Sequence, residues 1–124
     1  FHPVHHPSYI DFFERVLSQT KDPVEMSTRF EKAFAEDEWY RHLYRTSYAY
    51  HGVHPFYMWY WCAHALDHLG QVIIVGGNVE SVRRLGFRPA TTLHDAFEIA
   101  TDVVGPQPTI THLKTPPISM ANVQ

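Results

Sequence analysis

The chain has 124 residues, a mass of 14.4 kDa and a formal net charge of −3. This length predicts one domain with a single core. Ten basic side chains against 13 acidic ones create no positive field that would attract nucleic acid or an anionic membrane, so we expect neither as a partner. The single cysteine, Cys62, excludes an internal disulfide and favours a reducing, cytoplasmic compartment. No apolar run approaches the roughly 20 residues that span a bilayer.

Two helices are predicted to lead the chain. Ser8, followed by Asp11, has the spacing of a capping box, and apolar residues then recur at helical intervals over about residues 9 to 19. Asp22-Pro23 combines a capping side chain with a proline suited to the first helical position, which predicts a second helix to about Glu38. The run from Thr46 to Tyr50 then favours an extended strand.

The middle of the chain predicts a buried helix followed by a buried strand. From Pro55 to Leu69 almost every side of the helix is apolar, which is typical of a helix covered all round, and Gly70 is placed to end it. The β-branched run from Gln71 to Val75 is typical of a strand with both faces covered.

The last third of the chain predicts two helices and a closing strand. Asn78 and Thr92 are suited to cap helices that end at Gly86 and Gly105, and residues 109–114 alternate as a strand would. The sequence therefore predicts an α/β fold, a small three-layer domain with a short, mostly parallel sheet covered by helices and preceded by two helices. All 124 residues are expected to form this single domain.

Two histidines stand at the expected edge of this sheet. In a parallel sheet the loops that follow the strands share one edge, where open α/β folds bind ligands. His51 and His54 occupy such a loop, and the helix start beside His54 would favour a carboxylate or phosphate, so we expect a small anionic substrate. The alternative is that both imidazoles only satisfy backbone groups of the loop.

Other chemistry-bearing residues give weaker indications. His64 and His68 are four residues apart on a predicted helix and could hold a metal between them, or could form a packed histidine pair. The residue after His64 is Ala65, so the zinc-protease pattern is missing. Gly76-Gly77 lacks the spacing of a dinucleotide-binding loop. Cys62 is expected to be an inert core residue.

The segment from Tyr50 to the end of the chain resembles the C-terminal domain of the nickel-dependent lactate racemase family. The resemblance lies in spacing and hydrophobicity, and it covers roughly residues 50 to 124. Its features are the aromatic helix entered through His54-Pro55, the strand Val72-Ile73-Ile74-Val75, the turn Arg83-Arg84-Leu85-Gly86-Phe87, the helix start Thr92-Leu93-His94-Asp95-Ala96, and a closing strand with Pro116-Pro117.

This resemblance implies an α/β enzyme of two domains. Such enzymes invert the carbon of a 2-hydroxy acid by moving a hydride to and from a nickel pincer nucleotide. The groups that hold this cofactor and act as acid and base belong mainly to the family's N-terminal domain, which we do not expect within residues 1–124. The chain, which begins at Phe1 rather than Met, is thus expected to be the C-terminal part of a larger protein, with the N-terminal domain as its partner.

The resemblance implies a substrate-closing role rather than catalysis for this chain. His51, His54 and Tyr57 are the expected substrate-binding residues, and no catalytic residue or metal ligand is expected here. Lactate racemase itself has an amide or lysine near these positions, so the aromatic and histidine side chains found here argue against lactate as the substrate.

Two other functions remain open from the sequence. One is a non-catalytic α/β binding or interaction domain with structural histidines, and the other is a self-sufficient metal hydrolase with histidine ligands. A domain cut from the enzyme should expose a broad aromatic surface with His51 and His54 on its rim. Stoichiometric zinc would favour the hydrolase.

Overall fold

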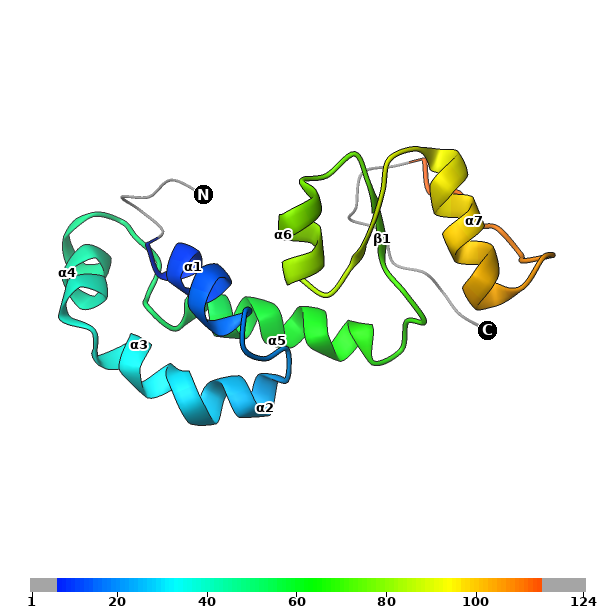
Figure 1. Cartoon of the computed structure of the whole chain (residues 1–124). Coiled ribbons are helices and arrows are strands. Elements are labelled where there is room, and N and C mark those ends of the chain that lie inside the picture. Colours follow the sequence, from blue (N-terminus) through cyan, green and yellow to red (C-terminus); the bar gives the residue numbers. More distant parts are fainter. Residues whose placement is uncertain (1–6, 115–124) are drawn as a thin grey trace.

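A computed structural model describes residues 7–114 (Figure 1). Six continuous helical segments and two short strands occur in this range. Four of the helical segments precede the first strand, and the remainder of the described chain follows the order strand, helix, strand, helix. The predicted α/β class with a short parallel sheet between helices is confirmed. None of the helices in residues 7–114 has the length and apolar character needed to cross a bilayer.

The first two helical segments each contain a π-helical stretch. The first comprises α1 (Pro7–Asp11) and η1 (Phe12–Val16), and the second comprises α2 (Pro23–Met26), η2 (Ser27–Glu31) and α3 (Lys32–Glu36). The Asp22 carboxylate accepts hydrogen bonds from the backbone N–H groups of Val24 and Glu25, as the sequence predicted. Ser8 is a buried residue inside α1 rather than its cap, since the helix already begins at Pro7.

The second predicted helix ends earlier than expected, because Asp37 interrupts it. Asp37 has an extended ψ of 119°, and its carboxylate accepts a hydrogen bond from the Tyr40 N–H, which begins the separate helix α4 (Glu38–Thr46). Thr46 thus ends a helix, and residues 48–50 adopt no regular structure. The predicted strand over residues 46–50 is therefore wrong.

Helix α5 (His54–Leu66) is the centre of the helical half. Phe56 packs edge-on against Phe12 and Phe34, with ring centroids 4.8 and 5.0 Å apart, and the Trp59 indole donates to the Lys21 carbonyl at 2.9 Å. The opposite side of α5 is exposed, so the prediction that this helix is covered all round is wrong. The core residues of this half are Phe12, Val16, Leu17, Met26, Phe34, Tyr40, Val53, Phe56, Trp59 and Ala63.

The sheet consists of two parallel strands. β1 (Ile73–Val75) pairs with β2 (Arg88–Ala90) in a register that joins Ile73 to Arg88 and Val75 to Ala90. Helix α6 (Val79–Arg84) connects them, and α7 (Leu93–Val104) follows β2 and contacts both strands. In Figure 1, α6 and α7 lie on opposite sides of the strands, which gives the predicted helix–sheet–helix layering.

Two of the three predicted strands do not occur. Besides the helical turn found at Thr46, residues 109–114 have no regular structure, although their alternation predicted a strand. The second strand of the sheet is instead β2, which the sequence analysis missed because Pro89 lies in its centre. Pro116 and Pro117, which were expected to follow the closing strand, lie outside the described residues.

The two halves of the chain meet through α6 and the turn after it. Val82 of α6 is buried, and Leu85 packs against the helical core. Arg84 forms an ion pair with Glu14, and its guanidinium lies 5.3 Å from the centre of the Phe13 ring. This junction links the first helical segment to the sheet region across 70 positions of the sequence.

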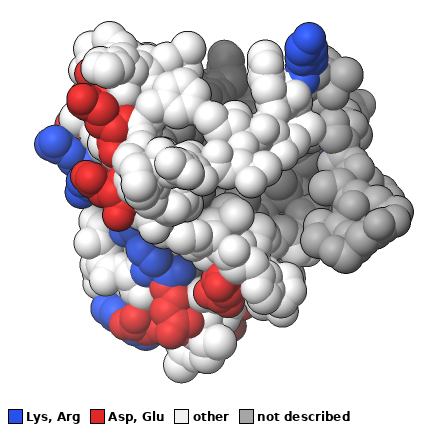
Figure 2. All heavy atoms as spheres, turned by 90° about the vertical axis from the view of Figure 1, so that its right-hand side faces the viewer, with Lys and Arg blue, Asp and Glu red and all other residues white. Residues whose placement is uncertain are grey.

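Helix α7 is amphipathic but has no fully buried residue. Thr92 caps this helix as predicted, and with Asp95 it forms a capping box, in which the Thr92 hydroxyl accepts from the Asp95 N–H at 3.1 Å. Leu93, Phe97 and Val104 are 68%, 51% and 61% exposed. Figure 2 looks onto this side of the molecule, and uncharged atoms occupy most of the described surface, with charged groups mainly at its left and lower margins.

Candidate functional site

Tyr9, Tyr50 and His54 form a cluster where α1 meets the start of α5; we call it the His54 cluster. The Tyr9 hydroxyl is hydrogen-bonded to Nδ1 of His54. The His54 ring stacks on Tyr50 with centroids 4.2 Å apart and an interplanar angle of 14°. The Tyr9 ring lies 5.7 Å from His54 and 6.1 Å from Tyr50. An imidazole that the sequence placed in a loop is thus held by two aromatic side chains.

The turn that leads into His54 lies tightly against the preceding helices because of Gly52. A Cβ atom at this position would lie 2.3 Å from the Phe34 carbonyl oxygen and 3.1 Å from Cδ2 of Tyr40. No side chain fits there without displacement of backbone. Gly52 therefore fixes where His51 and His54 leave the core.

His51 has its own contacts, separate from the His54 cluster. Its ring meets Tyr44 of α4 edge-on, with centroids 5.2 Å apart and an interplanar angle of 81°. Its Nδ1 accepts a long hydrogen bond of 3.4 Å from the Val53 N–H. His51 thus satisfies a backbone group of its own loop, which is the structural alternative considered from the sequence.

His51 and His54 do not lie at the edge of the sheet, so their predicted position is wrong. His51 lies in the loop between α4 and α5, and His54 is the first residue of α5; within residues 7–114 no strand precedes them. The loops that follow β1 and β2 instead begin at Gly76 and Thr91. The histidines therefore lie at a junction of helices rather than at the carboxyl edge of the sheet.

The start of α5 has few backbone donors left for an anion. The His54 N–H donates to the His51 carbonyl at 2.9 Å, the Phe56 N–H donates to the Val53 carbonyl at 3.0 Å, and Pro55 has no N–H group. The backbone at the start of α5 therefore gives no support to the expected small anionic substrate. Side chains would have to provide the contacts of such a substrate.

Tyr57 lies apart from the two histidines. It is 55% exposed and lines a hollow of about 190 Å³ with residues of α2 and η2, whereas His54 contacts α1. The other lining residues are Pro23, Met26, Ser27, Glu31, Phe56 and Tyr60. The structure thus places the three predicted substrate-binding residues in three different surroundings.

A groove of about 230 Å³ adjoins the His54 cluster. Tyr9 and Pro55 belong to its wall, together with apolar residues of α5 and of the turn after α6, and Cys62 also lines it. Cys62 is exposed, so its expected place in the core is wrong. The volume is slightly below the range of about 300–1,000 Å³ that is usual for ligand pockets.

His64 and His68 lie side by side on the exposed surface of the chain. Their ring centroids are 5.8 Å apart at an interplanar angle of 85°. Within residues 7–114 no group of three His, Cys, Asp or Glu side chains is arranged to hold a metal ion. The described residues thus give no support to the metal hydrolase.

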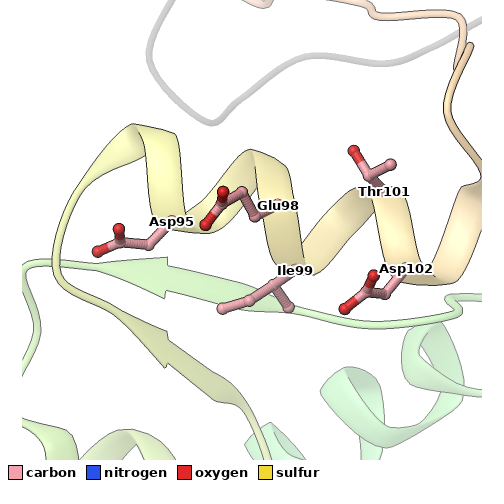
Figure 3. Close-up of a pocket in the computed structure, with 5 residues that line it drawn as sticks. All are labelled: Asp95, Glu98, Ile99, Thr101 and Asp102. Atoms are coloured by element: carbon pink, nitrogen blue, oxygen red, sulfur yellow. The ribbon is translucent and has the colours of Figure 1, made fainter.

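Three carboxylates lie along α7 beside a shallow hollow (Figure 3). Asp95 belongs to the capping box with Thr92, and Glu98 lies 3.5 Å from Nε2 of His94. Asp102 also lines this hollow. Since Asp95 and Glu98 already have partners within the helix, this face is a solvated helix surface rather than a site.

Two phenols flank the candidate region, Tyr9, which is half-buried, and Tyr40, which is buried. Burial, with Tyr50 beside it, raises the pKa of Tyr9. Burial and the hydrogen bond that its hydroxyl donates to Asp11 raise the pKa of Tyr40. Both phenols are therefore protonated at neutral pH, and each can donate a hydrogen bond.

Tyr9 was not predicted as a site residue. It lies 45 positions before His54, within an amphipathic helix whose aromatic residues predict core packing. No local pattern indicates such a distant contact.

Comparison of the chain with protein-family models, with curated proteins and with solved structures gives no match in any of the three.

Proposed function

We propose that this chain is the C-terminal, substrate-closing domain of a lactate racemase-like enzyme that racemises or epimerises a 2-hydroxy acid. The resemblance of residues 50 to 124 to that family suggests the reaction. In the proposed enzyme the N-terminal domain holds the nickel pincer nucleotide, which supplies the hydride chemistry. The chain described here contributes closure over the cleft and contacts to the substrate.

One observation carries this proposal, namely the amount of aromatic surface that the chain leaves exposed. Seven aromatic side chains between Trp39 and Trp61 are between 50% and 102% exposed. Tyrosine and tryptophan side chains are enriched at protein interfaces, so these exposed side chains mark a candidate interaction surface. His51 and His54 lie in the same stretch of chain. The exposed aromatic residues are Trp39, Tyr44, Tyr48, Tyr50, Tyr57, Tyr60 and Trp61.

Within this proposal His54 is the residue best placed to meet a substrate. It is partly exposed, its Nδ1 is bonded to Tyr9, and its ring is stacked on Tyr50. A held imidazole can donate a hydrogen bond to a carboxylate or hydroxyl oxygen without the entropic cost of ordering a mobile side chain. Tyr57 contributes to the aromatic surface instead.

A second candidate is a non-catalytic α/β binding domain in which the histidines are structural. The contacts of His51 favour it, because its Nδ1 accepts the Val53 N–H and its ring packs on Tyr44. In that case the exposed aromatic surface would bind a separate partner protein rather than a domain of the same enzyme.

Replacement of His54 by Ala in the full-length protein separates the two candidates. We expect racemisation to fall tenfold or more, equivalent to about 1.4 kcal/mol of transition-state stabilisation. His68→Ala is the matched control, since His68 is an exposed imidazole whose ring packs against His64, away from the His54 cluster. An unchanged rate constant for His54→Ala would remove His54 from the site. Absence of racemisation in the unmodified protein would favour the binding domain.

A further inference from the structure

Tyr9 contributes to the surroundings of His54 from a different part of the fold. It belongs to α1, whereas His54 begins α5, and their contact is partly buried. The ring of Tyr9 lines the neighbouring apolar groove, and its hydroxyl reaches Nδ1 of the imidazole. One end of this side chain therefore packs, while the other makes a specific polar contact.

The His54 ring has little freedom to rotate away from Tyr9. Tyr50 stacks nearly parallel to it at 4.2 Å, and the Tyr9 ring lies 5.7 Å away on a tilted plane. The His54 backbone is also fixed, because its N–H donates to the His51 carbonyl at 2.9 Å. These contacts hold Nδ1 toward the protein.

The contact with Tyr9 also bears on which ring nitrogen carries the proton in neutral His54. A protonated phenol can donate to an imidazole nitrogen or accept from its N–H, and donation from Tyr9 to Nδ1 corresponds to the tautomer with the ring proton on Nε2. No residue among 7–114 forms a hydrogen bond with Nε2. His54 as a whole is partly exposed, so a ligand can approach this residue from solvent.

We propose that Tyr9 is a positioning residue, which fixes His54 with Nε2–H directed at the ligand. The group that this donor recognises is an oxygen acceptor, namely the carboxylate or the hydroxyl oxygen of the substrate. This inference rests on the proposed function only for the identity of the ligand. The effect of Tyr9 on the tautomer of His54 holds whatever binds there.

The tautomer is measured by ¹⁵N NMR of the histidine rings in the full chain of 124 residues, at a pH where His54 is neutral. In the unmodified protein we expect the Nε2–H tautomer of His54. In Tyr9→Phe, which keeps the ring and removes only the hydroxyl, we expect a mixture of tautomers, so that the Nδ1 resonance moves toward the position of a protonated nitrogen.

Tyr44→Phe is the matched control. Its ring contacts His51 rather than His54, and Tyr44 is 54% exposed, so removal of this hydroxyl should leave the His54 resonances unchanged. The His51 resonances report in the same spectra whether Tyr9→Phe has disturbed the loop. An unchanged tautomer in Tyr9→Phe would overturn the inference. So would the Nδ1–H tautomer in the unmodified protein, a result that needs no variant to fold.

Kinetics of the full-length protein separate this inference from the proposed function. We expect Tyr9→Phe to lower kcat/KM for racemisation about threefold to tenfold, less than His54→Ala, because the imidazole remains present. A shifted tautomer with an unchanged rate would leave Tyr9 as a positioning residue but contradict the role of His54 in racemisation. A racemisation rate that falls in His54→Ala, together with an unchanged tautomer in Tyr9→Phe, would support the role of His54 in racemisation but contradict the positioning role of Tyr9.

Discussion

The helical half of this chain, residues 7–69, and the sheet half, residues 70–114, differ in how completely they bury their apolar side chains. The helical half has a continuous core of ten buried residues around Phe56 and Trp59. In the sheet half, Val82 is the one fully buried hydrophobic side chain among the described residues. The difference indicates that the helical half can hold its own structure, whereas the sheet half gains little from burial and depends on its neighbours.

The outer surfaces of the two halves also differ. The helical half exposes tyrosine and tryptophan side chains, which combine a large apolar area with a polar group. The sheet half exposes aliphatic residues and one phenylalanine on α7. Tyrosine and tryptophan side chains are enriched at interfaces, so the helical half is the better candidate to contact another domain.

The largest expected effect comes from the same substitution made in each half. Phe56→Ala removes a ring that is 5% exposed and packs on two other phenylalanines, and should lower the free energy of unfolding by about 3–5 kcal/mol. Phe97→Ala removes a ring that is 51% exposed and should change it by less than about 0.5 kcal/mol. Urea unfolding followed by circular dichroism measures the stability of both variants. Equal losses of stability would contradict the difference in burial between the two halves.

A smaller effect is expected from the polar contact between α1 and α4. The Tyr40 hydroxyl donates to the Asp11 carboxylate, so Tyr40→Phe should cost about 1–2 kcal/mol in a partly buried position. The raised pKa of Tyr40 also makes the free energy of unfolding depend on pH. Below the ordinary value of 10.0 the stabilisation is complete, and it should be lost as the pH rises above 10.0, because only the unfolded state then releases the proton.

Unfolding measured between pH 8 and pH 11 checks this second prediction. The unmodified protein should lose stability above about pH 10, and Tyr40→Phe should show a shallower decline. Identical slopes for the two proteins would mean that another group causes the decline.

The parts of the fold that the sequence predicted well depend on local hydrogen bonds. Asp22, Asn78 and Thr92 cap helices where expected, because each accepts from a backbone N–H within three residues. The strands were predicted poorly, since pairing depends on distant residues. Residues 109–114 alternate correctly but have no strand partner, while β2 pairs with β1 despite Pro89 at an edge.

In the candidate site, too, the sequence indicated a single residue but not its contacts with distant residues. The sequence singled out His54, and the structure adds Tyr9, a contact across 45 positions that no spacing reveals. The sequence also predicted a pocket shared with His51 and Tyr57, on the basis of a strand before His51. That strand does not exist, because Asp37 restarts a helix that continues to Thr46.

Amide hydrogen exchange tests most directly whether the two halves differ in stability. In the chain of 124 residues, we expect the slowest amides in the middle of α5, around Trp59 and Ala63. The amides of β1, β2 and α7 should exchange about tenfold faster or more, because they open without unfolding of the helical core. Equal protection of α5 and α7 would contradict this account and show that the chain unfolds as a single cooperative unit.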